Sequence, residues 1–214
     1  MSEYKDYSWQ DDSFTCAHNY LTKKIECLLP QDHSPILDLG CGNGVLANYL
    51  ISKGFNVYGT DASESGISIA RNKNRDRFFI QDFYSEELPY ELSNINFKTI
   101  ISTEVIEHLY NPRKYISLCK SILNKSKGGK LVMSTPYNGY LKYLSLSICG
   151  TMDRHLTALW DGGHIKFWSR KTLTTILTEN DFEITDFIGC GRIPYLWKSM
   201  VLVSQLKLIK KKQL

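Results

Sequence analysis

The sequence predicts an α/β fold in which seven strands form a doubly wound, mostly parallel sheet with helices on both faces. From Pro35 onward, short apolar runs typical of buried strands alternate with segments that repeat apolar residues at helical spacing. This alternation is typical of parallel strands joined by right-handed crossovers. A chain of 214 residues that is 43% hydrophobic can also bury one full core, so we expect one such sheet.

The first elements follow in order. Residues 14–29 carry apolar positions at helical spacing and end before a proline, so we expect a helix there and assign residues 1–34 to an N-terminal helical cap. The apolar run 35–40 predicts the first strand. Residues 45–53 predict a helix that ends at Gly54, and this helix opens the strand–helix alternation.

The central part continues this alternation. Strands predicted at 56–62 and 77–82 flank a helix over 63–73, for which Ser63 is a suitable N-cap. A fourth strand lies within 96–105, which is almost continuously apolar. Parallel strands covered on both faces have this character, so we expect this strand to be parallel and covered on both faces.

The C-terminal half completes the sheet. A helix that opens with a proline is predicted over about 112–123, and a glycine turn leads into a fifth strand over 128–136. Residues 168–180 predict another helix. Two last strands follow near 182–190 and 196–204, which brings the expected number of strands to seven.

The domain over residues 35–214 has one long interruption, at about 136–167. It falls between the fifth strand and the next helix, at the edge where a doubly wound sheet binds its ligand, so we predict a substrate lid there. Within it, apolar side chains recur at near-helical spacing and predict a packed helix face. The alternative is an apolar lid over the acceptor or a surface that touches a membrane. These residues are Tyr140, Tyr143, Leu144 and Ile148.

A cluster of glycines, Gly40, Gly42 and Gly44, follows the first predicted strand in ILDLGCGNG. A glycine-rich turn between a strand and its helix lets the backbone approach a ligand closely. The dinucleotide fingerprint G-x-G-x-x-G/A needs a small residue where this chain has Val45, and the lysine of a P-loop is missing too. The cluster therefore departs from both nucleotide-binding patterns.

With Asp38 ahead of it, DLGCGNG resembles motif I of the class I S-adenosylmethionine-dependent methyltransferases, and the resemblance runs from about Ile36 to the end of the chain. It implies a Rossmann-like fold that binds S-adenosylmethionine. In that family an acid after the second strand, here Asp61, accepts from both ribose hydroxyls, and an acid after the third, here Asp82, accepts from the adenine amine. The implied cofactor-binding residues are Asp38, Gly40, Cys41, Gly42, Gly44, Asp61, Ala62, Asp82, Phe83 and Glu104.

Two acids and a histidine follow the fourth predicted strand in STEVIEHL. Glu104, Glu107 and His108 stand at i, i+3 and i+4, so they share one face if the segment is helical. Two carboxylates and an imidazole suit magnesium, manganese or zinc. EVIEHL resembles the ubiquinone-biosynthesis O-methyltransferases and the small-RNA 3′-terminal 2′-O-methyltransferases. In the RNA enzymes this motif and a later histidine, here His164, bind a metal; the alternative is that the glutamates orient the cofactor loop without one.

Three histidines are candidate catalytic residues: His108, His155 and His164. A bound metal would lower the pKa of an acceptor hydroxyl, whereas without a metal His108 or His155 would take the proton as a general base. His18 reaches the site only if the N-terminal helix caps it. His33 is expected in a loop.

The expected reaction is methyl transfer to a hydroxyl of a small or lipid-like, ring-bearing acceptor of the phenol or quinol type, a class implied by the resemblance to the quinone enzymes. One alternative is a metal-dependent RNA 3′-terminal 2′-O-methyltransferase. Another is a nonenzymatic module that binds the cofactor. A net charge of +4 is mild for a nucleic-acid binder, so nucleic acid is not the expected partner.

Composition also bears on location. The six cysteines form no C-x-x-C pair, the first residues do not resemble a signal peptide, and no apolar run approaches the ~20 residues that span a bilayer. We therefore predict reduced thiols and a cytoplasmic location, with peripheral membrane contact as the alternative. The segment KLIKKK is expected to be a solvated tail that would add attraction to anionic lipid. The sequence does not fix the oligomeric state.

Overall fold

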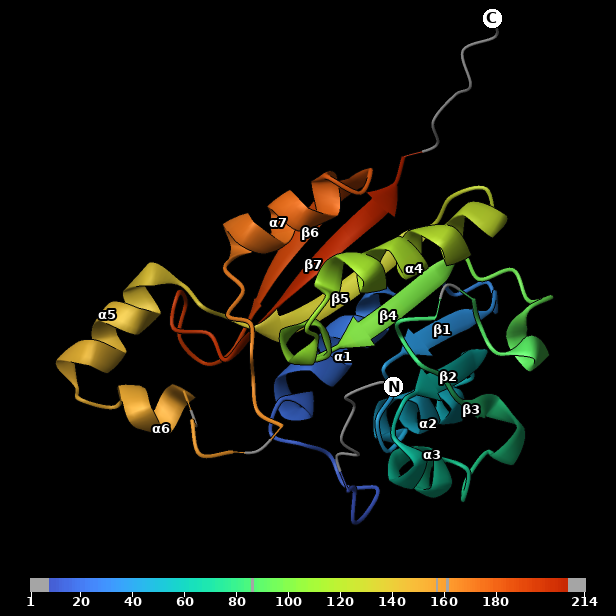
Figure 1. Ribbon diagram of the computed structural model, residues 1–214, viewed down its shortest axis with the longest axis horizontal. Coiled ribbons are helices and arrows are strands. Elements are labelled where there is room, and N and C mark those ends of the chain that lie inside the picture. The colour runs from blue at the N-terminus through green and yellow to red at the C-terminus, as the bar shows by residue number, and fades with distance from the viewer. Residues whose placement is uncertain (1–7, 86, 157, 161, 208–214) are drawn as a thin grey trace, which may run out of the picture.

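A seven-stranded sheet with helices on both faces forms the centre of the structure, a computed structural model that describes residues 8–85, 87–156, 158–160 and 162–207 (Figure 1). The strands are β1 (Ile36–Leu39), β2 (Val57–Asp61), β3 (Phe78–Ile80), β4 (Thr99–Thr103), β5 (Lys130–Pro136), β6 (Phe182–Cys190) and β7 (Ser199–Leu206). The α-helices are α1 (His18–Leu28), α2 (Val45–Ser52), α3 (Glu64–Ala70), α4 (Pro112–Lys125), α5 (Tyr140–Ile148), α6 (Met152–Leu156) and α7 (Arg170–Thr178). Short 3₁₀ turns lie at Arg75–Arg77, Tyr90–Leu92 and Ile106–His108.

The strand order is β3-β2-β1-β4-β5-β7-β6. Strands β1 to β5 pair in parallel, and β7 runs antiparallel to both of its neighbours, so β6 has the common direction again. The predicted doubly wound, mostly parallel sheet is therefore confirmed. Because the first five strands point the same way, their carboxyl ends meet at one edge of the sheet.

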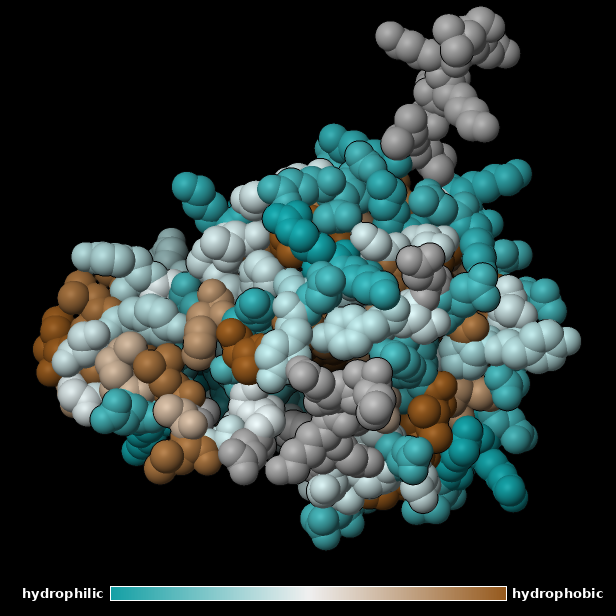
Figure 2. Space-filling view, viewed as in Figure 1, coloured by the Kyte–Doolittle hydropathy of each residue, from teal (hydrophilic) through white to brown (hydrophobic). Residues whose placement is uncertain are grey.

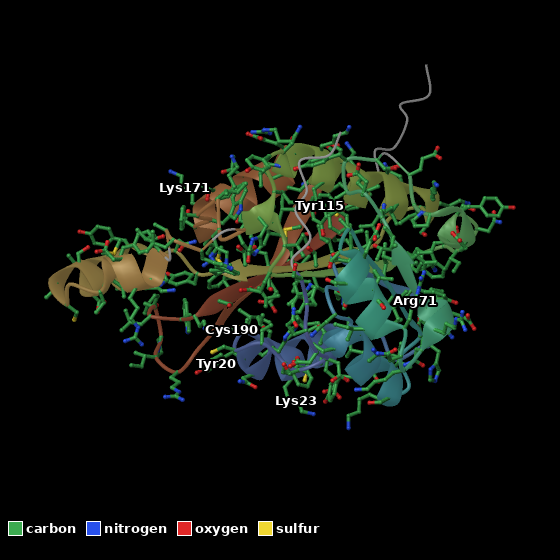
Figure 3. All side chains as sticks on the ribbon, turned by 60° about the horizontal axis from the view of Figure 1, so that its bottom comes forward. Tyr20, Lys23, Arg71, Tyr115, Lys171 and Cys190 are labelled. Carbon is green, nitrogen blue, oxygen red and sulfur yellow. The ribbon has the colours of Figure 1, made fainter. Side chains whose placement is uncertain are left out.

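Apolar side chains form one core on each face of the sheet. Tyr115 of α4 is fully buried in the first core, and its hydroxyl donates to the carbonyl oxygen of Leu39 at 2.7 Å and lies 2.8 Å from Ser102 Oγ. Tyr20 of α1 packs against the second core, so the two labelled tyrosines lie on opposite sides of the sheet (Figure 3). The N-terminal helix thus covers one face, as the sequence predicts, but it begins at His18 rather than near residue 14.

The long interruption folds into α5 and α6, which project from the side of the sheet (Figure 1). The packed-face interpretation is wrong for three of its four apolar residues: Tyr140 and Ile148 are 80% and 76% exposed, and Leu144 is exposed as well, whereas Tyr143 is half-buried. The buried residue of α5 is Lys142. The reason is that no further layer covers the outer side of this helix, so the apolar stripe faces outward.

The remaining expectations concern the cysteines, membrane-spanning helices, the C-terminal tail and the domain boundary. All six cysteines fall within the described ranges and are free. Among the described residues, no helix has both the length and the apolar character needed to cross a bilayer. The predicted solvated tail lies outside the described residues, apart from Lys207. The division at residue 34 stays a prediction.

Candidate functional site

A cavity of about 1480 Å³ opens at the carboxyl ends of the strands. Its floor is formed by the residues that follow β1, β2, β3 and β4. Its remaining walls come from α1 and the segment before it, from α5 and α6, from residues 162–167 and from residues 191–199. The edge that the alternating pattern identifies as the ligand-binding edge is therefore the edge that is hollowed.

The glycine loop after β1 has a backbone that only glycine adopts readily, because its three glycines have φ angles of 90°, 54° and 71°. A Cβ atom on Gly42 would lie 2.7 Å from Cζ2 of Trp9, whose side chain also lines the cavity. The N–H of Gly42 donates to Asp61 Oδ2 at 2.8 Å, and the N–H of Ser63 donates to Asp61 Oδ1 at 2.8 Å. Asp61 therefore fastens the loop to the start of α3.

A second acid lies beneath the loop. Asp38 is 1% exposed and lines the cavity, and its Oδ1 has no hydrogen-bond partner among the described residues. Burial, and secondarily the charge of Asp61, raises the pKa of Asp38 to about 8. A buried carboxylate oxygen without a donor is costly, so this position fits a ligand that brings a donor, such as the amino group of an amino-acid cofactor.

The third acid, Asp82, follows β3 and is exposed in the cavity wall, where its Oδ1 accepts from the N–H of Tyr84 at 2.8 Å. Phe83 beside it is buried and stacks edge-on against Tyr115. Nine of the ten predicted cofactor-binding residues line the cavity: Asp38, Gly40, Cys41, Gly42, Asp61, Ala62, Asp82, Phe83 and Glu104. Gly44 lies outside it, as the N-cap residue of α2.

The expectation that STEVIEHL is a helix with one functional face is wrong. The segment is a 3₁₀ turn, Ile106–His108, and Glu104 before it has a φ of 55°. Its carboxylate accepts from Ser134 Oγ at 2.9 Å and from Ser199 Oγ at 3.1 Å, and burial raises the pKa of Glu104 to about 7. Glu104 is not part of the group formed by the other three predicted metal ligands, although its charge raises the pKa of Glu107.

Those three ligands do come together: one ligand atom from each of Glu107, His108 and His164 lies within 4.8 Å of the others. The backbone makes this contact, because the N–H groups of Ile165 and Lys166 both donate to the carbonyl oxygen of Glu107 at 3.0 Å. The two imidazole rings are 4.9 Å apart. These two backbone hydrogen bonds therefore bring His164 next to Glu107 and His108.

The chemistry of this group suits a divalent cation. Glu107 is 1% exposed; its Oε2 accepts from Thr135 Oγ1 at 3.0 Å, whereas Oε1 has no partner among the described residues. Burial, and then the charge of His108, lowers the pKa of His164 to about 4, so its imidazole is neutral at pH 7. One orphaned carboxylate oxygen and neutral imidazoles are donors that zinc, manganese or magnesium accepts.

The remaining histidines differ in position. His155, on α6, lines the cavity 5.8 Å from the ring of Tyr143, and burial lowers its pKa. His18 also lines the cavity, because α1 caps it, and burial lowers the pKa of His18 to about 4. His33 lies in a loop, with Nδ1 3.1 Å from the carbonyl oxygen of Gly54.

The side chains of the cavity wall that the sequence analysis does not identify include Trp9, Lys142 and Lys198. Of these three, only Lys142 has a recognisable sequence signal, since it is the single charged residue in the apolar stretch GYLKYLSLSIC. A charge inside an apolar helix pattern indicates either a solvated position or one that faces a polar cavity. Here it faces the cavity.

Comparison with known proteins agrees with this geometry. The sequence profile of the methyltransferase domain family matches residues 16–186. The ubiquinone biosynthesis O-methyltransferase of Dinoroseobacter shibae is 29% identical over 182 residues, which are 80% of this chain and 72% of that protein. The protein of the same name from Roseobacter denitrificans is 29% identical over 195 residues, 85% of this chain and 76% of that protein.

Two solved structures share the fold. One is magnesium protoporphyrin IX methyltransferase (ChlM) from Synechocystis PCC 6803 with bound SAH, which has a TM-score of 0.62 and is 20% identical in sequence. The match covers 87% of this chain and 82% of the ChlM chain. The methyltransferase domain of bacterial CtHen1 has a TM-score of 0.61 and is 21% identical in sequence. The match covers 86% of this chain and 97% of the CtHen1 chain.

Proposed function

This chain belongs to the methyltransferase domain family and is an S-adenosylmethionine-dependent methyltransferase, and we propose that it methylates a hydroxyl of a small or lipid-like acceptor of the phenol or quinol type. One observation carries the proposal: a single cavity joins the glycine loop and its acids to a cluster of histidines. The two relatives named for ubiquinone biosynthesis support an oxygen acceptor on a ring.

When bound, the cofactor supplies an electrophilic methyl group on a cationic sulfonium. The glycine loop would hold the cofactor, with Asp61 accepting from its sugar hydroxyls, Asp82 accepting from the adenine amine and the orphaned Oδ1 of Asp38 accepting from its amino group. Trp9 and α1 line this half of the cavity and would help to exclude water, so that the acceptor rather than water reaches the methyl group.

The acceptor hydroxyl must lose a proton. His155 is the base that we assign, because it lines the cavity and its lowered pKa keeps the imidazole neutral at pH 7. His108 is the second candidate base; its Nδ1 lies 3.1 Å from the carbonyl oxygen of Gly162. We further propose that Glu107, His108 and His164 hold a divalent ion, which would lower the pKa of the hydroxyl.

The test is methyl transfer from methyl-labelled S-adenosylmethionine to catechols, prenylated quinols and RNA 3′ ends. We expect labelled phenol or catechol ethers with the wild type, loss of transfer in Asp61→Asn and His155→Gln, and retention in Asp76→Asn, an exposed acid outside the cavity. Transfer that survives Asp61→Asn, or no transfer to any hydroxyl, would contradict the proposal.

The cluster of Glu107, His108 and His164 also favours a second candidate function, a metal-dependent RNA 3′-terminal 2′-O-methyltransferase. Label that appears on RNA ends, and only in the presence of a divalent ion, would make RNA the acceptor. Label on catechols alone would reject RNA.

The exposed apolar face of α5 supports a further part of the proposal, peripheral contact with a membrane. Figure 2 shows apolar side chains gathered at the end of the molecule that α5 forms, and they include Tyr140, Leu141, Leu144 and Ile148. An apolar helix face of this kind can lie in the lipid interface. We expect co-sedimentation with phosphatidylglycerol vesicles that Leu144→Asp with Ile148→Asp removes; unchanged binding would reject this face.

A further inference from the structure

The charged side chains that line the cavity are separated by sign. Four acids lie at or near the carboxyl ends of the first four strands: Asp38, Asp61, Asp82 and Glu104. Four cations come from α5, α6 and the segment between β6 and β7: Lys142, Arg154, Arg192 and Lys198. The acids other than Glu104 therefore belong to the part of the cavity assigned to the cofactor, and the cations belong to the part left for the acceptor. Glu104 lies between the two, since the charges of Lys198 and Lys142 lower its pKa.

Lys142 is the most informative of these cations because its side chain is buried. It is 9% exposed, and Nζ donates to the carbonyl oxygen of Tyr137 at 2.9 Å. An ammonium has three N–H donors, and Lys142 forms no ion pair with any carboxylate in the part of the chain that the structure describes. Buried charges are normally paired, and the charge of Glu104 does raise the pKa of Lys142. No ion pair joins the two side chains, however, so N–H donors of the ammonium are left for a further anion.

Lys198 adds to the same positive region. Its Nζ lies 3.1 Å from Cys16 Sγ, and within the described ranges it too has no carboxylate partner. Burial, and then the charge of Lys198, lowers the pKa of Lys142 to about 8, so the Lys142 ammonium is still mostly charged at neutral pH. Both lysines also lower the pKa values of His155 and His164, whose own burial is the larger cause, which is consistent with their lying beside the histidines.

We propose that the methyl acceptor carries an acidic group, a carboxylate or a phosphate, and that this group binds between Lys142 and Lys198. The inference rests on the proposed transfer to a hydroxyl acceptor and deepens it by naming the charge of that acceptor. Arg154 and Arg192 have exposed side chains in the cavity wall, where they attract the anion toward the site. The α5 insertion thereby selects the substrate by charge.

The test compares 3,4-dihydroxybenzoate with 3,4-dihydroxybenzamide, two catechols that differ in charge and hardly in shape. Two quantities are measured: kcat/KM for transfer from labelled S-adenosylmethionine, and Kd by calorimetry on protein saturated with S-adenosylhomocysteine. One or two charge-assisted hydrogen bonds correspond to a preference of about 10- to 100-fold for the benzoate. A phosphonate analogue of the same catechol, if it binds more tightly than the benzoate, indicates a phosphorylated acceptor.

Variants connect this preference to the lysines. Lys142→Met is expected to remove most of it and Lys142→Arg to restore it. Lys198→Met is expected to reduce the preference for the benzoate as well. Because Lys198 is exposed, this substitution should not affect folding. Lys171→Met, on the exposed surface of α7, is the matched control and is expected to keep the wild-type preference (Figure 3).

Several outcomes would overturn the inference: equal use of benzoate and benzamide by the wild type, no binding of the benzoate, or a preference that survives both methionine variants. A loss of S-adenosylmethionine affinity in Lys142→Met with the preference retained would also overturn it, because the lysine would then bind the carboxylate of the cofactor. Selective binding of the benzoate without methylation of either catechol would support the anion site and refute the phenol-type acceptor.

Discussion

Replacing Gly42 by alanine is expected to weaken cofactor binding at least about tenfold while the chain remains folded. The residue has a φ of 54°, and an L-residue in the left-handed region costs about 1–2 kcal/mol. The added Cβ would also lie 2.7 Å from Trp9 Cζ2, so the indole must shift within the cavity wall. A total cost of about 1–3 kcal/mol is small beside the 5–15 kcal/mol that usually stabilises a domain.

The assay pairs calorimetric titration of S-adenosylmethionine with urea unfolding. We expect at least about a tenfold loss of affinity, ~1.4 kcal/mol, because the loop backbone can no longer approach the ligand. Gly54→Ala is the matched control: Gly54 has a φ of 91°, and nothing lies within 4 Å of its added Cβ. It should lose comparable stability and no affinity. Wild-type affinity in Gly42→Ala, or an equal loss in Gly54→Ala, would refute the reasoning.

Three other predictions concern stability and metal content. Tyr115→Phe removes the buried donor to the carbonyl oxygen of Leu39 and should lower the free energy of unfolding in urea by about 1–3 kcal/mol; a change below ~0.5 kcal/mol would contradict this. Burial lowers the pKa of His18 to about 4, so the unfolded chain takes up the proton first as pH falls below about 6.5. His18 should therefore contribute about 2 kcal/mol of stability loss between pH 7.5 and pH 5, so the stability of the wild type should fall by about that much more than the stability of His18→Gln; equal changes in the two proteins would show that His18 does not contribute. Elemental analysis should find a stoichiometric divalent ion in the wild type and none in Glu107→Gln; active wild-type protein without metal would remove the ion from the proposal.

Features written in local sequence were predictable. The alternation of apolar runs and helical spacing located every strand to within a few residues. This is possible because a strand buried on both faces needs a continuous apolar run, whereas a helix buried on one face needs apolar residues every three or four positions. The glycine loop and the acids at the carboxyl ends of β1, β2 and β3 were equally predictable from the sequence. A residue that follows a parallel strand must lie at the carboxyl edge, so Asp61 and Asp82 reach the cavity without any knowledge of packing.

Features that depend on backbone angles or on contacts between distant segments were not predictable from the sequence. The single positive φ of Glu104 turns its carboxylate toward Ser134 and Ser199, and no helical spacing rule anticipates that turn. His164 reaches Glu107 only because two backbone N–H groups from a distant segment bind the carbonyl oxygen of Glu107.

The sequence by itself determined the order of the elements, the edge where the ligand binds and the cofactor loop, since each depends on neighbours along the chain. The tertiary structure alone decided which helix faces were covered. Because no described element covers the outer side of α5, most of its apolar side chains face outward and Lys142 turns toward the cavity, so the position of this charge follows from packing rather than from periodicity.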